Sequence, residues 1–259
     1  MPNPADVVAK IERGLDRGPI YTETPEEIRD QLPFVGTIAE PWNTATAFLF
    51  VVIVLIWIVR LRGRLFNYPF LLATLPILLI GGIGGTLYHG TRSWVGYFLM
   101  DVVPINILGL AVSIYLWIRL GPKLRHFFAM LIVLALITLT GQFTLPRVWA
   151  INVSYAGLAL IILVPIVLTL IRTCGLHSGW IGTAIVSFVF AWFFRLADVL
   201  DPPLLPMGTH WLWHTFGALT TAALSEYMYL IEGVSLKKPN LGRKLFSDRA
   251  AGSNAKRCL

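Results

Sequence analysis

The sequence predicts an all-α membrane protein, a bundle of seven transmembrane helices, and two observations lead to this fold class. Hydrophobic residues make up 56% of the 259 residues and charged residues only 14%, which is too apolar for a water-soluble domain. Seven apolar segments, each near the roughly 20 residues that a helix needs to cross the hydrocarbon core, follow one another with short connections. Apolar and polar residues do not alternate in them, so helices are the only spanning structure left. We therefore expect a multi-pass integral membrane protein.

The distribution of charged residues divides the chain into three regions. Residues 1–42 are expected to form an amphipathic and acidic N-terminal segment, with eight acidic and four basic side chains. Residues 43–232 hold the seven-helix transmembrane domain, and residues 233–259 form a basic tail with seven basic side chains and one acidic one. The predicted spans lie at about 43–60, 68–89, 96–118, 125–143, 151–171, 179–199 and 210–231.

The N-terminal segment has two parts of different character. In the first, Val7, Val8, Ile11 and Leu15 recur at helical spacing, which predicts a short amphipathic helix. This helix either lies on the bilayer surface or is solvated. An acidic stretch between Tyr21 and Pro33 follows it.

Loop charges predict how the chain is oriented in the membrane. The loops after the first, third and fifth predicted helices and the C-terminal tail are basic, whereas the opposite loops carry little beyond Arg92 and Arg147. Because basic loops stay on the cytoplasmic side, we expect a cytoplasmic C-terminus and a non-cytoplasmic N-terminus. The net charge of +7 therefore reflects topology, and the expected partner is the lipid bilayer, with no nucleic acid.

Three histidines and one aspartate are predicted to meet at one level of the bundle. His210 and His214 stand four residues apart at the start of the last helix, which places them on one face. The second helix ends at His89, and the third carries Asp101 about one turn after its start. Three imidazoles with an open fourth position are typical of catalytic zinc, and Asp101 would exchange protons with the bound water.

Each polar residue in this set also has a plainer interpretation. His210 and His214 lie among tryptophans and would serve as interfacial anchors, and His89 would be hydrated at a helix end. Their common level favours a metal, because buried ionisable groups in a membrane are costly. Asp198 is expected either to accept a hydrogen bond from a ligand histidine or to pair with Arg195.

Short motifs in the expected order give the chain a family resemblance. They are Ala39-Glu40-Pro41-Trp42-Asn43-Thr44, Thr86-Leu87-Tyr88-His89, Asp101-Val102-Val103-Pro104, Arg195-Leu196-Ala197-Asp198 and His210-Trp211-Leu212-Trp213-His214-Thr215. Over residues 38–232 the sequence resembles the alkaline ceramidases, seven-helix membrane hydrolases of sphingolipid metabolism. That family cleaves the amide bond of ceramide to a sphingoid base and a fatty acid.

The resemblance implies a set of site residues. His89, His210 and His214 match the zinc ligands, and Asp101 matches the aspartate that holds the zinc water. A family serine precedes the first histidine by four residues, but Gly85 occupies that position here, and we expect the neighbouring Thr86 to assist catalysis in its place.

The resemblance also implies a calcium ion, because family enzymes bind one through their acidic N-terminal segment. Glu40 matches one calcium-binding glutamate, and Glu23 lies in a stretch that loosely resembles the rest of the calcium-binding motif. The expected cofactors are therefore Zn²⁺ and Ca²⁺.

Two other functions stay open at this stage. A seven-helix receptor with a structural zinc site would use the same ligands, because fold does not settle function, and the missing serine favours it. A transporter with Asp101 and Glu226 on a proton path fits the membrane charges but leaves three histidines unexplained. The sequence does not indicate an oligomeric state, an acyl-chain preference or a particular membrane.

Overall fold

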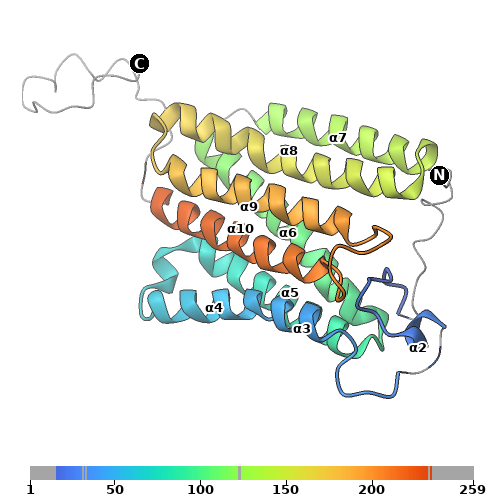
Figure 1. The fold of residues 1–259 in the computed structure, drawn as a ribbon. Coiled ribbons are helices and arrows are strands. Elements are labelled where there is room, and N and C mark those ends of the chain that lie inside the picture. Colours follow the sequence, from blue (N-terminus) through green and yellow to red (C-terminus); the bar gives the residue numbers. More distant parts are fainter. Residues whose placement is uncertain (1–15, 31, 33, 122–123, 233, 235–259) are drawn as a thin grey trace, which may run out of the picture. The chain divides into compact units, whose positions relative to one another are not determined.

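The computed structural model describes residues 16–30, 32, 34–121, 124–232 and 234, and helices are the only regular elements in this part of the chain (Figure 1). The amphipathic helix predicted around residues 7–15 and nearly all of the basic tail lie outside the described residues. The helices are α2 (Glu26–Arg29), α3 (Pro41–Ala47), α4 (Leu49–Arg60), η1 (Leu65–Asn67), α5 (Pro69–Thr91), α6 (Val95–Leu120), α7 (Leu124–Thr144), α8 (Arg147–Thr173), α9 (Ser178–Ala197) and α10 (His210–Ile231).

Every apolar segment predicted from the sequence corresponds to a long helix, or to the consecutive pair α3 and α4. Local chemistry explains several of the boundaries. Pro41 and Pro69 each stand in the first turn of their helix, where a missing N–H costs nothing and the fixed φ is already helical. Pro146 directly precedes α8, and Gly175 follows the end of that helix with a φ of 74°.

In the described part of the chain, six helices are long and apolar enough to cross a membrane, which makes the protein a multi-pass membrane protein by composition. Their bounds are Pro41–Arg60, Pro69–Thr91, Val95–Leu120, Arg125–Thr144, Asn152–Thr173 and Ser178–Ala197. Helix α10 has the length expected of a seventh span, 22 residues, but it is not among the six. Its two histidines, several threonines and Glu226 lower its mean hydropathy.

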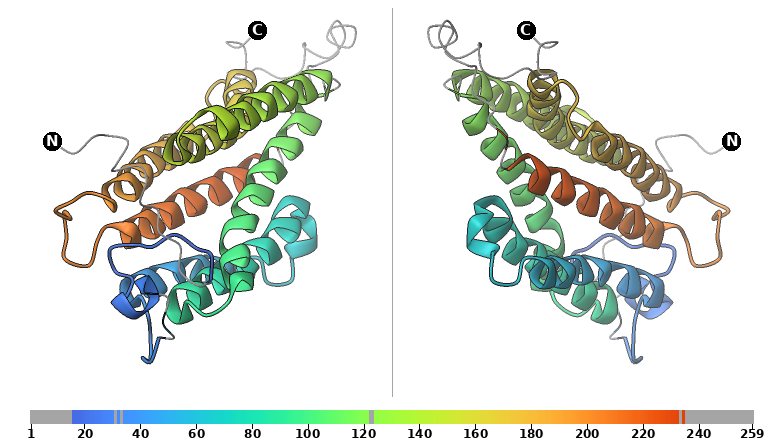
Figure 2. Two further views of the ribbon diagram at one scale, coloured as in Figure 1. Left: turned by 90° about the vertical axis from the view of Figure 1, so that its right-hand side faces the viewer. Right: turned by 90° about the vertical axis from the view of Figure 1, so that its left-hand side faces the viewer.

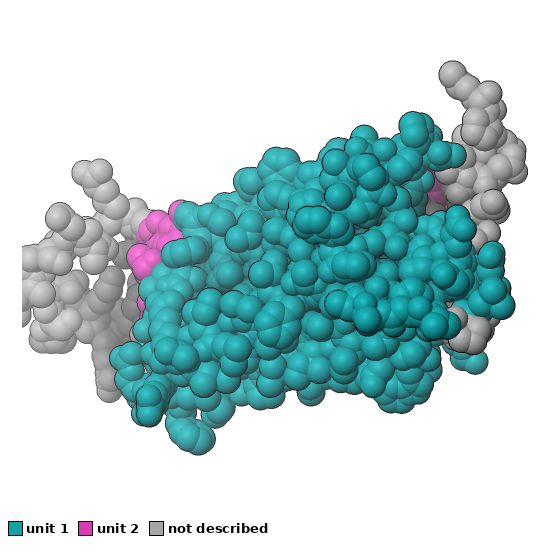
Figure 3. Space-filling view, turned by 60° about the horizontal axis from the view of Figure 1, so that its bottom comes forward, with its two compact units in different colours: residues 1–108, 179–232 teal, residues 109–178, 233–259 magenta. Residues whose placement is uncertain are grey.

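The described chain forms two compact units, which are coloured separately in Figure 3. Unit 2 comprises residues 109–178 and 233–259. In it, α7 and α8 lie side by side (Figure 1), and the Ser113 hydroxyl donates to the Ile161 carbonyl at 2.8 Å. Many apolar side chains on these helices are exposed, among them Ile132, Leu136 and Leu139, each more than half exposed, which suits contact with lipid.

Unit 1 comprises residues 1–108 and 179–232, and α10 packs in it against α3, α4 and α5 (Figure 2). Glycines let α5 come close to its neighbours. A Cβ added to Gly82 would meet Val51 at 2.9 Å, and one added to Gly81 would meet Pro104 at 3.1 Å. Small residues allow membrane helices to approach closely in this way.

An ion pair ties the C-terminal half of α10 to α4. Both oxygens of Glu226 accept hydrogen bonds from the Arg60 guanidinium, which also lies over the rings of Trp57 and Tyr229 at 4.7 and 4.5 Å. Glu226 therefore joins α10 to α4 through this ion pair.

Candidate metal centre

Three buried histidines converge at one end of unit 1. His89 lies in the last turn of α5, and His210 and His214 lie in the first two turns of α10. A nitrogen of each ring lies within 4.8 Å of a nitrogen of both others, and the Nε2 atoms of His89 and His214 are 3.1 Å apart. The side chains are at most 5% exposed. The convergence predicted from helix order is therefore confirmed.

The three histidines could hold a divalent metal ion, and one pair of their nitrogens has the separation that such an ion requires. Two ligands at about 2.05 Å from a tetrahedral zinc ion would stand about 3.3 Å apart, close to the 3.1 Å between the two Nε2 atoms. Imidazole nitrogens suit zinc and also copper, iron and nickel. Three such nitrogens leave a fourth position for water or substrate.

Glu40 fixes the tautomer of His89. One oxygen of its carboxylate lies 2.5 Å from Nδ1 of His89, and both side chains are fully buried. A carboxylate only accepts, so Nδ1 carries the proton and Nε2 presents its lone pair to the other histidines. The Glu40 main-chain N–H also donates to the His89 carbonyl at 3.1 Å, which holds α3 against the end of α5. Sequence spacing gave no sign of this contact across 49 residues.

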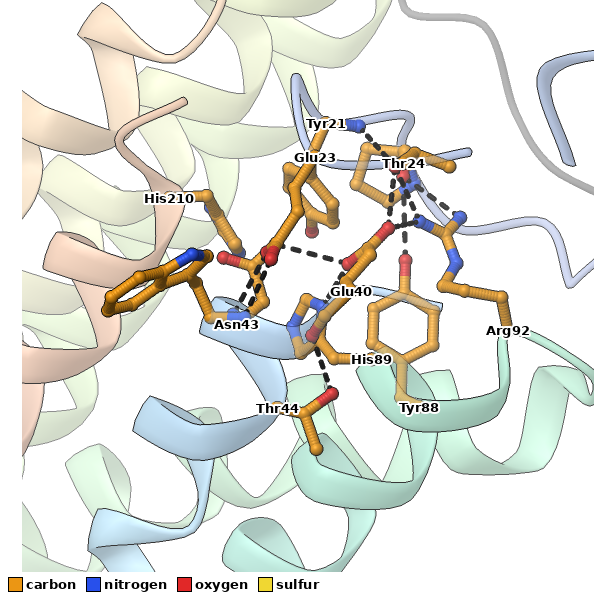
Figure 4. A network of polar contacts seen from close by, with 12 residues as sticks. Tyr21, Glu23, Thr24, Glu40, Asn43, Thr44, Tyr88, His89, Arg92 and His210 are labelled. Carbon is orange, nitrogen blue, oxygen red and sulfur yellow. Dashed lines mark hydrogen bonds and ion pairs between the residues drawn. The ribbon is translucent and has the colours of Figure 1, made fainter. Parts of the chain in front are cut away.

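Arg92 holds the other oxygen of Glu40 (Figure 4). Its guanidinium donates at 2.5 Å to Glu40, at 2.6 and 3.1 Å to Asp16, at 3.2 Å to the Thr24 hydroxyl and at 3.1 Å to the Pro19 carbonyl. Burial raises the pKa of Glu40, but His89 and Arg92 outweigh it and lower that pKa to about 2. Glu40 is therefore a carboxylate, which is the form that accepts from His89.

Arg92 makes these contacts from a left-handed backbone conformation. It follows directly after α5 with a φ of 47°, which costs a residue with a side chain roughly 1–2 kcal/mol. The ion pairs with Asp16 and Glu40 hold it there. Burial lowers the pKa of Arg92, yet the charge of Glu40 and the hydrogen bond to Asp16 raise it above its ordinary value.

Asp198 organises the start of the helix that carries two of the histidines. One of its oxygens accepts from the main-chain N–H groups of Thr209 at 2.6 Å and His210 at 3.0 Å. These are two of the N–H groups that the first turn of α10 leaves unpaired. These hydrogen bonds come from main-chain groups and not from a histidine ring or Arg195, the two partners that the sequence suggested. The guanidinium of Arg195 lies over the ring of Trp213 at 5.5 Å.

Asp101 lies against α5 one turn before His89. A Cβ added to Gly85 would be 2.6 Å from Oδ1 of Asp101 and 3.4 Å from the Cβ of Ala47. The absence of a side chain at position 85 therefore makes room for the Asp101 carboxylate. The hydroxyl of Thr86, the residue predicted to assist catalysis, donates to the Gly82 carbonyl of its own helix at 2.7 Å. Consecutive helical residues point about 100° apart, so Thr86 does not occupy the position of the family serine.

Tyr21 covers the metal centre from the N-terminal segment. Its ring stacks on the ring of His210 with centroids 3.8 Å apart and lies 5.4 Å from that of His89. Burial, and then the charges of Asp101 and Glu40, raise the pKa of its phenol well above the ordinary value, so the hydroxyl keeps its proton. No residue in the described part of the chain hydrogen-bonds that hydroxyl. Tyr21 was not among the site residues predicted from the sequence.

The residues expected to bind calcium do not fit that ion. The two oxygens of Glu23 accept from the main-chain N–H groups of Trp42 at 2.6 Å and Asn43 at 3.0 Å, at the start of α3. Both oxygens of Glu40 face Arg92, Thr24, His89 and Asn43. Among the described residues, the three histidines are the only group arranged to hold a metal ion. All four carboxylate oxygens are thus occupied by protein donors, and a calcium ion needs six to eight free ones.

Comparison with known proteins does not assign a family. No family model matches the sequence, and no curated protein matches it.

Proposed function

We propose that the protein is a zinc-dependent membrane hydrolase that cleaves the amide bond of ceramide or of a similar lipid amide to a sphingoid base and a fatty acid. The observation that carries this proposal is the meeting of three buried imidazoles with the carboxylate of Asp101 packed one helical turn away. The resemblance of the motifs around these residues to the alkaline ceramidases supports the choice of substrate.

The proposal includes the topology predicted from loop charge. Helix α10 would be the seventh span, because it is 22 residues long and packs against α3, α4 and α5. The N-terminus would lie on the non-cytoplasmic side and the basic tail in the cytoplasm. The metal centre would then face the non-cytoplasmic leaflet, where a lipid amide sits at the headgroup level.

The residues around the centre suit amide hydrolysis. A bound zinc ion supplies a water molecule acidified to near neutrality and polarises a carbonyl. Asp101 would accept one proton from the attacking water as the water oxygen joins the carbonyl carbon, and would return that proton to the amine nitrogen when the C–N bond breaks. The phenol of Tyr21 donates a hydrogen bond to the carbonyl oxygen, where negative charge develops. Glu40 keeps His89 in the tautomer that offers Nε2.

Apolar surroundings favour a lipid over a water-soluble amide. Phe216, two residues after His214, stacks between Phe190 and Phe194 of α9 with centroids 5.3 and 5.6 Å away. Phe190 on α9 and Leu219 on α10 are each nearly half exposed. Exposed apolar side chains on α9 and α10 suit contact with the acyl chain of a lipid.

The test is release of fatty acid from ceramide by purified protein in detergent, with metal content measured on the same sample. We expect one zinc per chain, loss of activity with a chelator and recovery on adding zinc. Asp101→Asn should retain zinc and lower turnover by roughly 10²–10⁴-fold. Fatty-acid release that does not depend on zinc, or full turnover by Asp101→Asn, would contradict the mechanism.

A receptor-like protein with a structural zinc site is the second candidate, and one observation favours it. Position 85, which faces Asp101, carries glycine where the resembled family has serine. Such a protein would bind zinc but release no fatty acid in the same assay. The proton-path alternative is weakened, because Glu226 is engaged by Arg60.

A further inference from the structure

A fully buried charge cluster lies behind the metal centre. The side chains of Asp16, Glu40 and Arg92 have no exposed surface, and together they hold two negative charges and one positive charge. Buried charges are stable only when they are paired and hydrogen-bonded. Each of these three buried charges therefore depends on the other two for its stability.

All five N–H groups of the Arg92 guanidinium have acceptors. The Nε and Nη2 groups donate to Asp16 and to the Pro19 carbonyl, and Nη1 donates to Glu40 and to the Thr24 hydroxyl. A guanidinium offers only five donors, so the fit is complete. The acceptors are carboxylate, carbonyl and hydroxyl oxygens, the same types that a calcium ion takes as ligands.

The cluster reaches the histidines by two routes. Through Glu40, Arg92 acts on Nδ1 of His89. Through Asp16, Pro19 and Thr24, it holds residues 16–24 in place, and that segment lays Tyr21 on the ring of His210. The side chain of Arg92 also lies over the ring of Tyr88 at 4.8 Å, next to His89 in the sequence.

We propose that Arg92 is a built-in cation that takes the place of a calcium ion and positions the metal centre, so that the protein assembles its zinc site without calcium. Arg92 is a positioning residue, because it acts through Glu40 and through the N-terminal segment. The proposal rests on metal binding by the three histidines and does not depend on ceramide hydrolysis. A protein that binds zinc but cleaves no ceramide would leave it standing.

The experiment compares the full-length protein with Arg92→Ala in detergent. Thermal unfolding is followed with no added cation, with millimolar Ca²⁺, with millimolar Mg²⁺ and with guanidinium, and zinc affinity is measured by competition with a chromophoric chelator. The wild-type Tm should respond to Ca²⁺ no more than to Mg²⁺. Arg92→Ala should lose zinc affinity by about 10–100-fold, the usual effect of removing the partner of a ligand histidine.

Rescue of the variant is the decisive readout. Removal of the guanidinium leaves two carboxylates, a carbonyl and a hydroxyl around a cavity, so Ca²⁺ or guanidinium should raise the Tm of Arg92→Ala and restore its zinc affinity. Mg²⁺ should not, because it requires a smaller octahedral site. Trypsin should cleave after Arg17 in the variant and not in the rescued protein, because Arg92 no longer holds residues 16–24.

The matched control is Arg60→Ala, which removes an arginine that pairs with a glutamate at the other end of α10. It should lower the Tm without changing zinc affinity and without gaining a response to Ca²⁺. If Arg92→Ala does not fold, Arg92→Lys keeps the charge with fewer donors and should show a weaker zinc site. A saturable rise of the wild-type Tm with Ca²⁺, or unchanged zinc affinity in the Arg92 variants, overturns the proposal.

Discussion

Position 85 offers a sharp test of the role of Asp101. Gly85→Ala would place a methyl group 2.6 Å from Oδ1 of Asp101. Ordinary contact begins at 3.4 Å, so the carboxylate must retreat by about 0.8 Å. A misplacement of about 1 Å costs a catalytic group on the order of 10²-fold in rate. We therefore expect turnover of ceramide to fall by about 10–100-fold, or about 1.4–2.7 kcal/mol in activation free energy.

Zinc content should not change in this variant, since Gly85 does not contact the imidazole nitrogens. The fold should also survive, because alanine in a helix gains up to about 1 kcal/mol over glycine and the displaced atom ends a flexible side chain. Gly85→Ser should lose less than Gly85→Ala, because its hydroxyl donates to the displaced carboxylate.

Gly90→Ala is the control for Gly85→Ala on the same helix. A Cβ there would meet the Thr44 side chain at 3.6 Å, an ordinary contact, so activity should match that of the wild type. The assay is fatty-acid release at saturating substrate, with zinc measured in parallel. If Gly85→Ala and Gly90→Ala turn over equally fast, Asp101 does not act from the position that the structure gives it.

The remaining predictions separate metal binding, catalysis and stability. Glu40→Gln should weaken zinc binding by about 10–100-fold, measured by chelator competition, because His89 loses its charged partner; unchanged affinity would mean that the hydrogen bond is not needed. Tyr21→Phe should keep the zinc and lower turnover by about 10²-fold through loss of one hydrogen-bond donor, and a change in KM alone would assign Tyr21 to substrate binding instead. Asp198→Ala should lower the free energy of unfolding by about 1–2 kcal/mol, read from the Tm, because two N–H groups of α10 lose their acceptor; a Tm equal to that of the wild type would mean that water replaces the carboxylate.

The sequence located the long helices because their apolar runs are far longer than soluble helices need. It also brought His89 to His210 and His214, since chain direction and helix order fix the level of a residue that begins or ends a span. Both predictions depend only on the composition, the length and the order of individual segments. The predicted number of seven spans depends on α10. The polar side chains of this helix, among them His210 and His214, lower its mean hydropathy.

The sequence did not reveal the network behind the histidines. Glu40 meets His89 across 49 residues and Arg92 meets Asp16 across 76, and no periodicity connects such distant positions. In the sequence, Arg92 is an ordinary charged residue in a loop. Its left-handed backbone conformation and its burial depend on tertiary contacts, which the local sequence does not indicate. Glu40 was assigned to calcium by resemblance alone, whereas its neighbours in the structure are Thr24, Asn43, His89 and Arg92.

The polarity of α10 has a consequence for the biogenesis of the protein. A helix with two histidines and a glutamate would partition poorly from the translocon into lipid on its own. In the folded protein its polar groups meet partners on helices that are synthesised much earlier, Arg60 of α4 and His89 of α5. If α10 is the seventh span, we expect it to enter the bilayer only after α4 and α5 have assembled, so that its insertion would be a late step in the folding of the chain.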